Sequence, residues 1–61
     1  MKFKLEITMD NAAFDDAAQT EVAEILKKVA ARVDGANLHA DEWHFLLDSN
    51  GNNCGSWVVH S

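Results

Sequence analysis

Residues 48–57, DSNGNNCGSW, decide how the second half of the chain folds, because they join two apolar runs, EWHFLLD (42–48) and CGSWVVH (54–60). Asn and Gly between two such runs are typical of a β-hairpin. A three-residue loop would make Asp48 to Gly51 a type I turn, with Gly51 left-handed in a bulge. A two-residue loop at Asn50 and Gly51 is the alternative.

The loop length determines which hairpin side chains face the core, because a shift of one residue in the pairing moves every side chain of a strand to the opposite face of the sheet. The three-residue loop pairs Trp43 with Trp57 and places one set of side chains on a common face: Phe45, Leu47, Trp57 and Val59. The two-residue loop would pair Trp43 with Val58 and leave the two tryptophans on opposite faces. We expect the three-residue loop, because the alternative exposes a tryptophan.

The first half of the chain predicts one strand and one helix. Residues 2–8 alternate between apolar and polar side chains, as a half-buried strand does. Residues 16–33 follow the helical period, with a predicted buried stripe of Ala18, Val22, Ile25, Leu26, Val29 and Val33. We expect Asp15 or Asp16 to cap this helix and Gly35 to end it in a left-handed conformation.

The order of elements is therefore β-α-β-β, in a single small α+β domain of residues 1–61. The helix returns the chain, so the first two strands should run parallel. A right-handed crossover that skips one position lets the third strand lie between them, antiparallel to both. We expect one amphipathic helix packed on a three-stranded antiparallel sheet of order 1-3-2.

The net charge and composition favour some classes of binding partner and argue against others. Ten acidic and five basic residues give a net charge of −5, which argues against direct nucleic-acid binding, since phosphate contacts need Lys and Arg. A basic protein surface fits this charge, although solubility alone also explains it. The single cysteine, Cys54, excludes an intrachain disulfide and fits a reduced cytoplasm. We expect neither a signal peptide nor a membrane contact.

The hairpin contains residue types that reactive sites use, but their spacing argues against each site. In a calcium loop counted from Asp48, the required glycine and the bidentate acid would be Asn53 and Val59. A zinc or thiol site would draw on side chains that we expect on the helix-free face: His44, Cys54 and His60. Their spacing lacks a close ligand pair, and no cation or helix N-terminus is expected beside the thiol. We therefore expect no catalytic residue, no metal and no cofactor.

The expected topology gathers carboxylates at one end of the molecule, where the first strand ends, the helix begins and the hairpin turns. We call this set the acidic end: Asp10, Asp15, Asp16, Glu21 and Asp48. Helix capping and turn formation explain some of these residues structurally. Docking on a basic groove is the functional interpretation, and both can hold together.

The helix-free face of the sheet is a second candidate surface. We expect Leu46 and Val58 on it, flanked by polar side chains. This face would serve a partner or a weak dimer, although single exposed aliphatic side chains are common. A monomer is the favoured state.

Three segments carry a resemblance: KFKLEITMDNAAF (2–14), TEVAEILKKVAARVDG (20–35) and LLDSNGNNCGSW (46–57). They resemble small proteins of bacteriophages and mobile elements, and in particular are similar to anti-CRISPR proteins directed at type I complexes, type I-C among them. Some of that group are acidic DNA mimics that occupy the site where the complex contacts target DNA. The resemblance offers no catalytic motif, so it implies only a mode of action.

The expectation is therefore a non-enzymatic anti-CRISPR inhibitor in the cytoplasm of a bacterial host. It would bind the basic DNA-contacting surface of a Cascade-type CRISPR effector subunit through the acidic end and block target DNA binding. The alternative is a protein–protein interaction module of another role, which uses the helix-free sheet face.

Overall fold

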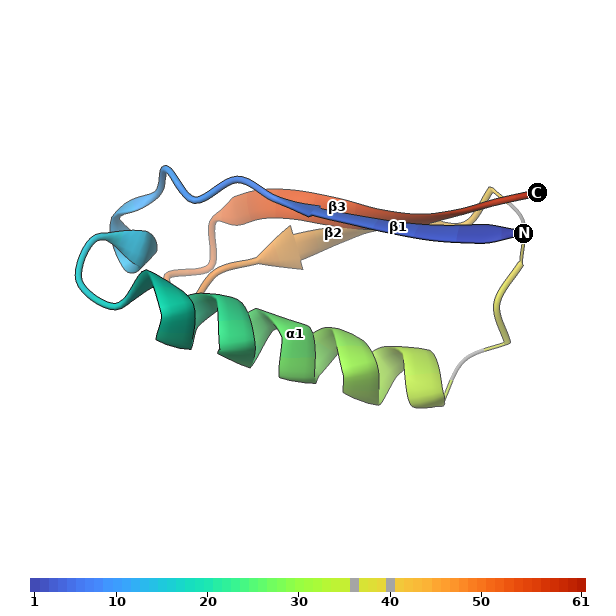
Figure 1. The fold of residues 1–61 in the computed structure, drawn as a ribbon, viewed down its shortest axis with the longest axis horizontal. Coiled ribbons are helices and arrows are strands. Elements are labelled where there is room, and N and C mark those ends of the chain that lie inside the picture. The colour runs from blue at the N-terminus through green and yellow to red at the C-terminus, as the bar shows by residue number, and fades with distance from the viewer. Residues whose placement is uncertain (36, 40) are drawn as a thin grey trace.

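The chain folds into one three-stranded sheet with a long helix against one face (Figure 1). The computed structural model describes residues 1–35, 37–39 and 41–61. Its elements are, in order, β1 (Lys2–Ile7), the 3-10 helix η1 (Ala12–Phe14), α1 (Ala18–Asp34), β2 (Trp43–Leu47) and β3 (Asn53–His60). The sheet order is β1-β3-β2, and β3 is antiparallel to both neighbours. The predicted α+β architecture and strand order are confirmed.

The two ends of α1 differ from the prediction. Its N-cap is Ala17, and no side chain of a described residue caps it, so the expected aspartate cap is wrong. The reason is that η1 precedes the helix and places Phe14 in the core, which leaves Asp15 and Asp16 in the connecting turn. At the other end, Gly35 has φ −94° rather than a left-handed conformation.

The hairpin turn has the predicted geometry. The Gly51 N–H donates to the Asp48 carbonyl at 3.0 Å, and the Asp48 N–H donates to the Asn52 carbonyl at 2.9 Å. Gly51 has φ 81°, in the left-handed region that glycine adopts without strain. These contacts confirm the three-residue loop.

A β-bulge beyond the turn then shifts the register of the hairpin. Leu47 pairs with Asn53, but the next pair joins Leu46 to Gly55, which leaves Cys54 as an extra residue in β3. The Cys54 side chain is buried, and its S–H donates to the Leu46 carbonyl at 3.5 Å. A bulge of this kind re-aims the side chains on either side of it.

In the observed register, the buried and exposed faces of β2 are exchanged relative to the prediction. Trp43 pairs with Val58, so the predicted pairing of Trp43 with Trp57 is wrong. Phe45 and Leu47, which were expected in the core, are each 54% exposed, whereas Leu46 is 5% exposed. The prediction for the buried face of β2 is therefore wrong, and so is the placement of Leu46 on the helix-free face.

The core lies between α1 and the sheet. Its buried members are Phe14, Ile25, Val29, Leu46, Cys54, Trp57 and Val59. Ile25 and Val29 form the centre of the helix stripe, and Leu26 lies beyond its edge with 45% of its surface exposed. The predicted stripe is correct except at Leu26.

Candidate functional site

Hydrogen bonds hold the hairpin turn against the start of α1 and the segment after β1. The Asn11 amide donates to Asp48 Oδ2 at 3.0 Å. The Ser49 N–H and hydroxyl donate to the two carboxylate oxygens of Glu21 at 2.9 and 2.8 Å. These three segments meet at one end of the molecule, opposite the chain termini (Figure 1). The structure therefore places them together, as the topology predicted.

Asp48 organises the turn from inside the protein. It is 4% exposed, and its Oδ1 accepts the N–H groups of Asn50 and Asn52 at 2.9 and 3.0 Å. Its Oδ2 accepts the Asn11 amide. These contacts, first the bond from Asn52, lower the pKa of Asp48 below its usual value. Both carboxylate oxygens of Asp48 therefore accept hydrogen bonds from within the chain, so this buried residue stabilises the fold of the acidic end.

The remaining carboxylates of the acidic end differ in exposure. Glu21 is half-buried and bonded to Ser49. Asp10, Asp15 and Asp16 are exposed, and none of the three forms an ion pair with another described residue. We call these three residues the exposed acidic triad.

The basic residues are placed away from this triad. β1 begins near the chain termini (Figure 1), and Lys2 and Lys4 lie in its first half. Lys27, Lys28 and Arg32 lie in the second half of α1. The chain is therefore polarised in charge along its length.

The three candidate zinc or thiol residues do not meet. Cys54 is 3% exposed in the core, and burial raises the pKa of its thiol, which disfavours the reactive thiolate. His44 faces the helix side and stacks on Trp57, with ring centroids 4.3 Å apart. His60 is exposed at the end of β3. The expectation that all three share the helix-free face is wrong, because the bulge redirects Cys54 and β2. No metal-binding group of three His, Cys, Asp or Glu residues occurs among the described residues.

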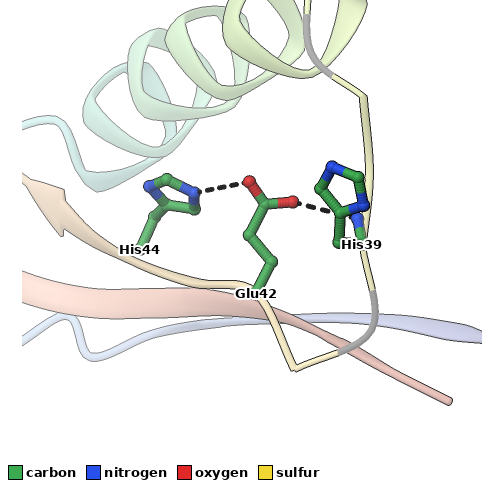
Figure 2. Close-up of polar contacts among 3 residues, drawn as sticks. All are labelled: His39, Glu42 and His44. Carbon is green, nitrogen blue, oxygen red and sulfur yellow. Dashed lines mark hydrogen bonds and ion pairs between the residues drawn. The ribbon is translucent and has the colours of Figure 1, made fainter.

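Glu42 joins the loop before β2 to the strand itself, as Figure 2 shows. Its Oε1 lies 3.1 Å from His44 Nε2, and its Oε2 accepts the His39 N–H at 3.2 Å. The bond to His44, followed by the bond from His39, lowers the pKa of Glu42. Sequence reasoning missed this pair, although Glu42 and His44 are two residues apart and side chains at that spacing lie on one side of a strand.

This carboxylate–imidazole pair has a structural role in the described part of the chain. The Glu42 carbonyl also accepts the Val59 N–H at 2.9 Å, which fastens the start of β2 to β3. No described hydroxyl or thiol is hydrogen-bonded to His44, so a nucleophile for this base is missing there. The cluster orients His44 over Trp57.

The helix-free face of β2 carries a row of exposed apolar side chains. Trp43 is 52% exposed, and Phe45 and Leu47 are 54% exposed. The Trp43 and Phe45 rings meet edge to face, with centroids 4.3 Å apart. Val58 lies beside Trp43 on β3 and is half-buried. We call Trp43, Phe45 and Leu47 the apolar row.

A groove of about 450 Å³ lies between α1 and β2. The residues that line it are Ile25, Lys28, Val29, Arg32, Phe45, Leu46, Leu47 and Trp57. It is an apolar groove with two cationic side chains from the helix, and it also reaches two members of the apolar row, Phe45 and Leu47, along β2.

Comparison of the chain with protein-family models, with characterised proteins and with solved structures gives no match. Within the described residues, no helix combines the length and the apolar character that a membrane span requires.

Proposed function

We propose that this protein is a non-enzymatic inhibitor that docks its acidic end on a basic, DNA-contacting protein surface. The observation that carries the proposal is the exposed acidic triad, which lies apart from every Lys and Arg of the chain. Unpaired carboxylates on a chain of net charge −5 favour encounter with a positively charged surface.

In this proposal the members of the acidic end have two different roles. Asp10, Asp15 and Asp16 stand in for phosphates against Lys and Arg of the partner. Glu21 and Asp48 hold the hairpin turn against the helix start through their hydrogen bonds. A surface that is already fixed before binding loses less conformational entropy when the partner docks.

The partner class follows from the resemblance to type I anti-CRISPR proteins. The partner would be a Cascade-type effector subunit in the cytoplasm of a bacterial host, and the bound protein would exclude target DNA. Such an interface should weaken strongly as salt rises above about 0.1 M, because exposed charges are screened over roughly 10 Å at that ionic strength.

Charge reversal tests the proposal. The triple variant Asp10→Lys, Asp15→Lys, Asp16→Lys should lose both binding to a purified type I-C effector complex and inhibition of its target-DNA binding. A matched control reverses three exposed carboxylates elsewhere, Glu6→Lys, Glu24→Lys and Asp34→Lys. This control has the same net charge as the triad variant and should retain much more inhibition.

Two outcomes would count against the proposal. If both triple variants inhibit equally, the acidic end is not the contact. If the wild-type chain does not bind the effector at low salt, the partner class is wrong. Circular dichroism of each variant would verify that the fold is intact.

The apolar row favours a second candidate, an interaction module that uses the helix-free sheet face. Aromatic side chains are enriched at protein interfaces relative to the rest of the surface. Phe45→Asp would disable this candidate and leave the exposed acidic triad unchanged. Leu46 is unsuitable for the same test because it is buried.

A further inference from the structure

The outer edge of β2 has no strand partner within the described sheet, because the order β1-β3-β2 leaves β2 at one side. Edge strands are commonly protected from pairing by charged side chains or proline. The opposite edge, β1, carries Lys2, Lys4 and Glu6. The sequence of β2 is WHFLL and contains neither proline nor a Lys, Arg, Asp or Glu. Among the described residues, no backbone–backbone hydrogen bond outside the sheet involves β2, so its outer edge is available to a further strand.

The groove beside this edge combines apolar and cationic surface. Ile25, Val29 and Trp57 are buried residues that line it. Lys28 and Arg32 also line it, are exposed, and form no ion pair with a described residue. On a chain with a net charge of −5, this groove is a locally basic site.

We propose that β2 and the groove bind an extended, acidic and apolar peptide segment of a partner protein by strand addition. The peptide backbone would hydrogen-bond to the outer edge of β2. On the side of the sheet that faces α1, its apolar side chains would enter the groove and its carboxylates would meet Lys28 and Arg32. On the other side, its side chains would pack beside the apolar row as cross-strand neighbours. This site lies apart from the exposed acidic triad, so the inference goes beyond the proposed function.

Charge favours such a peptide over a second copy of the chain. A two-fold axis through paired β2 strands would place both helices on the same side of the joined sheet. The Lys28 and Arg32 side chains of both copies would then face one another across the junction, where like charges repel. An acidic peptide neutralises the same two cations. It also satisfies the backbone groups of β2, which a lipid chain would leave unpaired.

The expected affinity is modest. An aromatic side chain buries roughly 150–250 Å² when fully covered, and the two aromatic members of the apolar row are already half covered. A strand of about eight residues is also shorter than the roughly 20–30 residues per side of a standard interface, so we expect a contact area below ~800 Å² per partner. We expect a dissociation constant on the order of 10–100 μM.

The probe is a synthetic peptide of about eight residues, blocked at both ends, in which every second residue is Thr and the others alternate between Glu and Val. Titration into the full chain, followed by NMR of the backbone amides, should shift the β2 amides and protect them from exchange. Replacing Glu by Gln in the peptide should weaken binding about tenfold. N-methylation of the peptide amides that face β2 should abolish it.

Adjacent lysines provide a matched pair of variants. Lys28→Glu should weaken peptide binding about tenfold, because Lys28 lines the groove. Lys27→Glu makes the same charge change one residue away, outside the residues that line the groove, and should alter binding less than about twofold. The charge-reversed triad variant should bind the peptide at least as well as the wild type, which separates this test from the test of the acidic end.

Three results would overturn the inference: no change at the β2 amides, equal effects of Lys27→Glu and Lys28→Glu, or equal binding of the Glu and Gln peptides. Self-association through β2, detected by sedimentation at the same protein concentrations, would also overturn the inference, because the occupant would then be a second copy.

Discussion

Replacing two neighbouring leucines tests the register of the hairpin. Leu46 is 5% exposed in the core and Leu47 is 54% exposed on the other face. Truncation of a buried leucine to alanine typically costs 2–5 kcal/mol, and we expect about 3 kcal/mol for Leu46→Ala. Leu47→Ala should cost roughly 0.5–1 kcal/mol, because half of its surface is already in water. A core of this size supplies only about 3–5 kcal/mol, so Leu46→Ala should leave much of the chain unfolded.

Urea denaturation measures the difference. With a slope of about 1 kcal/mol per molar urea, the two midpoints should differ by roughly 2 M. Tryptophan fluorescence reports the loss of the buried Trp57 environment, and far-UV circular dichroism provides an independent signal. If Leu46→Ala lacks a folded baseline, Leu46→Val and Leu47→Val give the same ranking at smaller cost. A larger loss of stability on truncation of Leu47 than on truncation of Leu46 would refute the bulged register and favour the unbulged one.

Three further outcomes follow from the contacts. Gly55→Ala should destabilise the fold by about 3 kcal/mol, because its Cβ would meet a backbone oxygen of β1, whereas Gly35→Ala has open space; urea midpoints compare them. The lowered pKa values of Asp48 and Glu42 should contribute stability that is complete above about pH 4.5 and is lost as pH falls through those lowered values. Urea denaturation between about pH 2 and 6 measures this loss, and Asp48→Asn should make the free energy of unfolding depend less steeply on pH. Cys54, buried and with a raised pKa, should react with a thiol reagent much more slowly in the native protein than in urea, and equal rates would contradict its burial.

The fold was predictable where the signals are local. The alternation of β1, the period of α1 and the turn at Asp48 to Gly51 each come from residues close in sequence. The strand order then followed from chain direction and the right-handed crossover.

The bulge escaped prediction because one extra residue inside a strand leaves the apolar pattern almost unchanged. Gly55 was the available signal, since glycine within a strand often marks a bulge or a close backbone approach. The structure shows both at this position, where Gly55 lies beside the bulge and against the backbone of β1. A correct turn therefore led to an incorrect face for β2.

For the acidic end as well, the arrangement of the segments was predictable from the sequence, but the hydrogen bonding of its carboxylates was not. Topology brought its segments together, but it could not separate exposed carboxylates from engaged ones. Glu21 is engaged by Ser49, 28 residues away in sequence, so no local pattern could reveal that contact. The engagement of Asp48 depends on the folded turn and on Asn11.

The bulge links stability to the surface that the protein presents. By burying Leu46 beside Trp57, it turns Trp43 and Phe45 outward on an unguarded edge strand. A chain with so small a core gains nothing in stability from exposing large aromatic side chains, and such patches on monomers mark interaction sites more often than chance. Covering of β2 by the proposed peptide strand would remove part of this exposed apolar surface from water. Because the exposed acidic triad lies between β1 and α1, and the groove is lined by α1 residues from Ile25 onward, the two proposed sites are separate, and a peptide on β2 would leave the acidic end accessible.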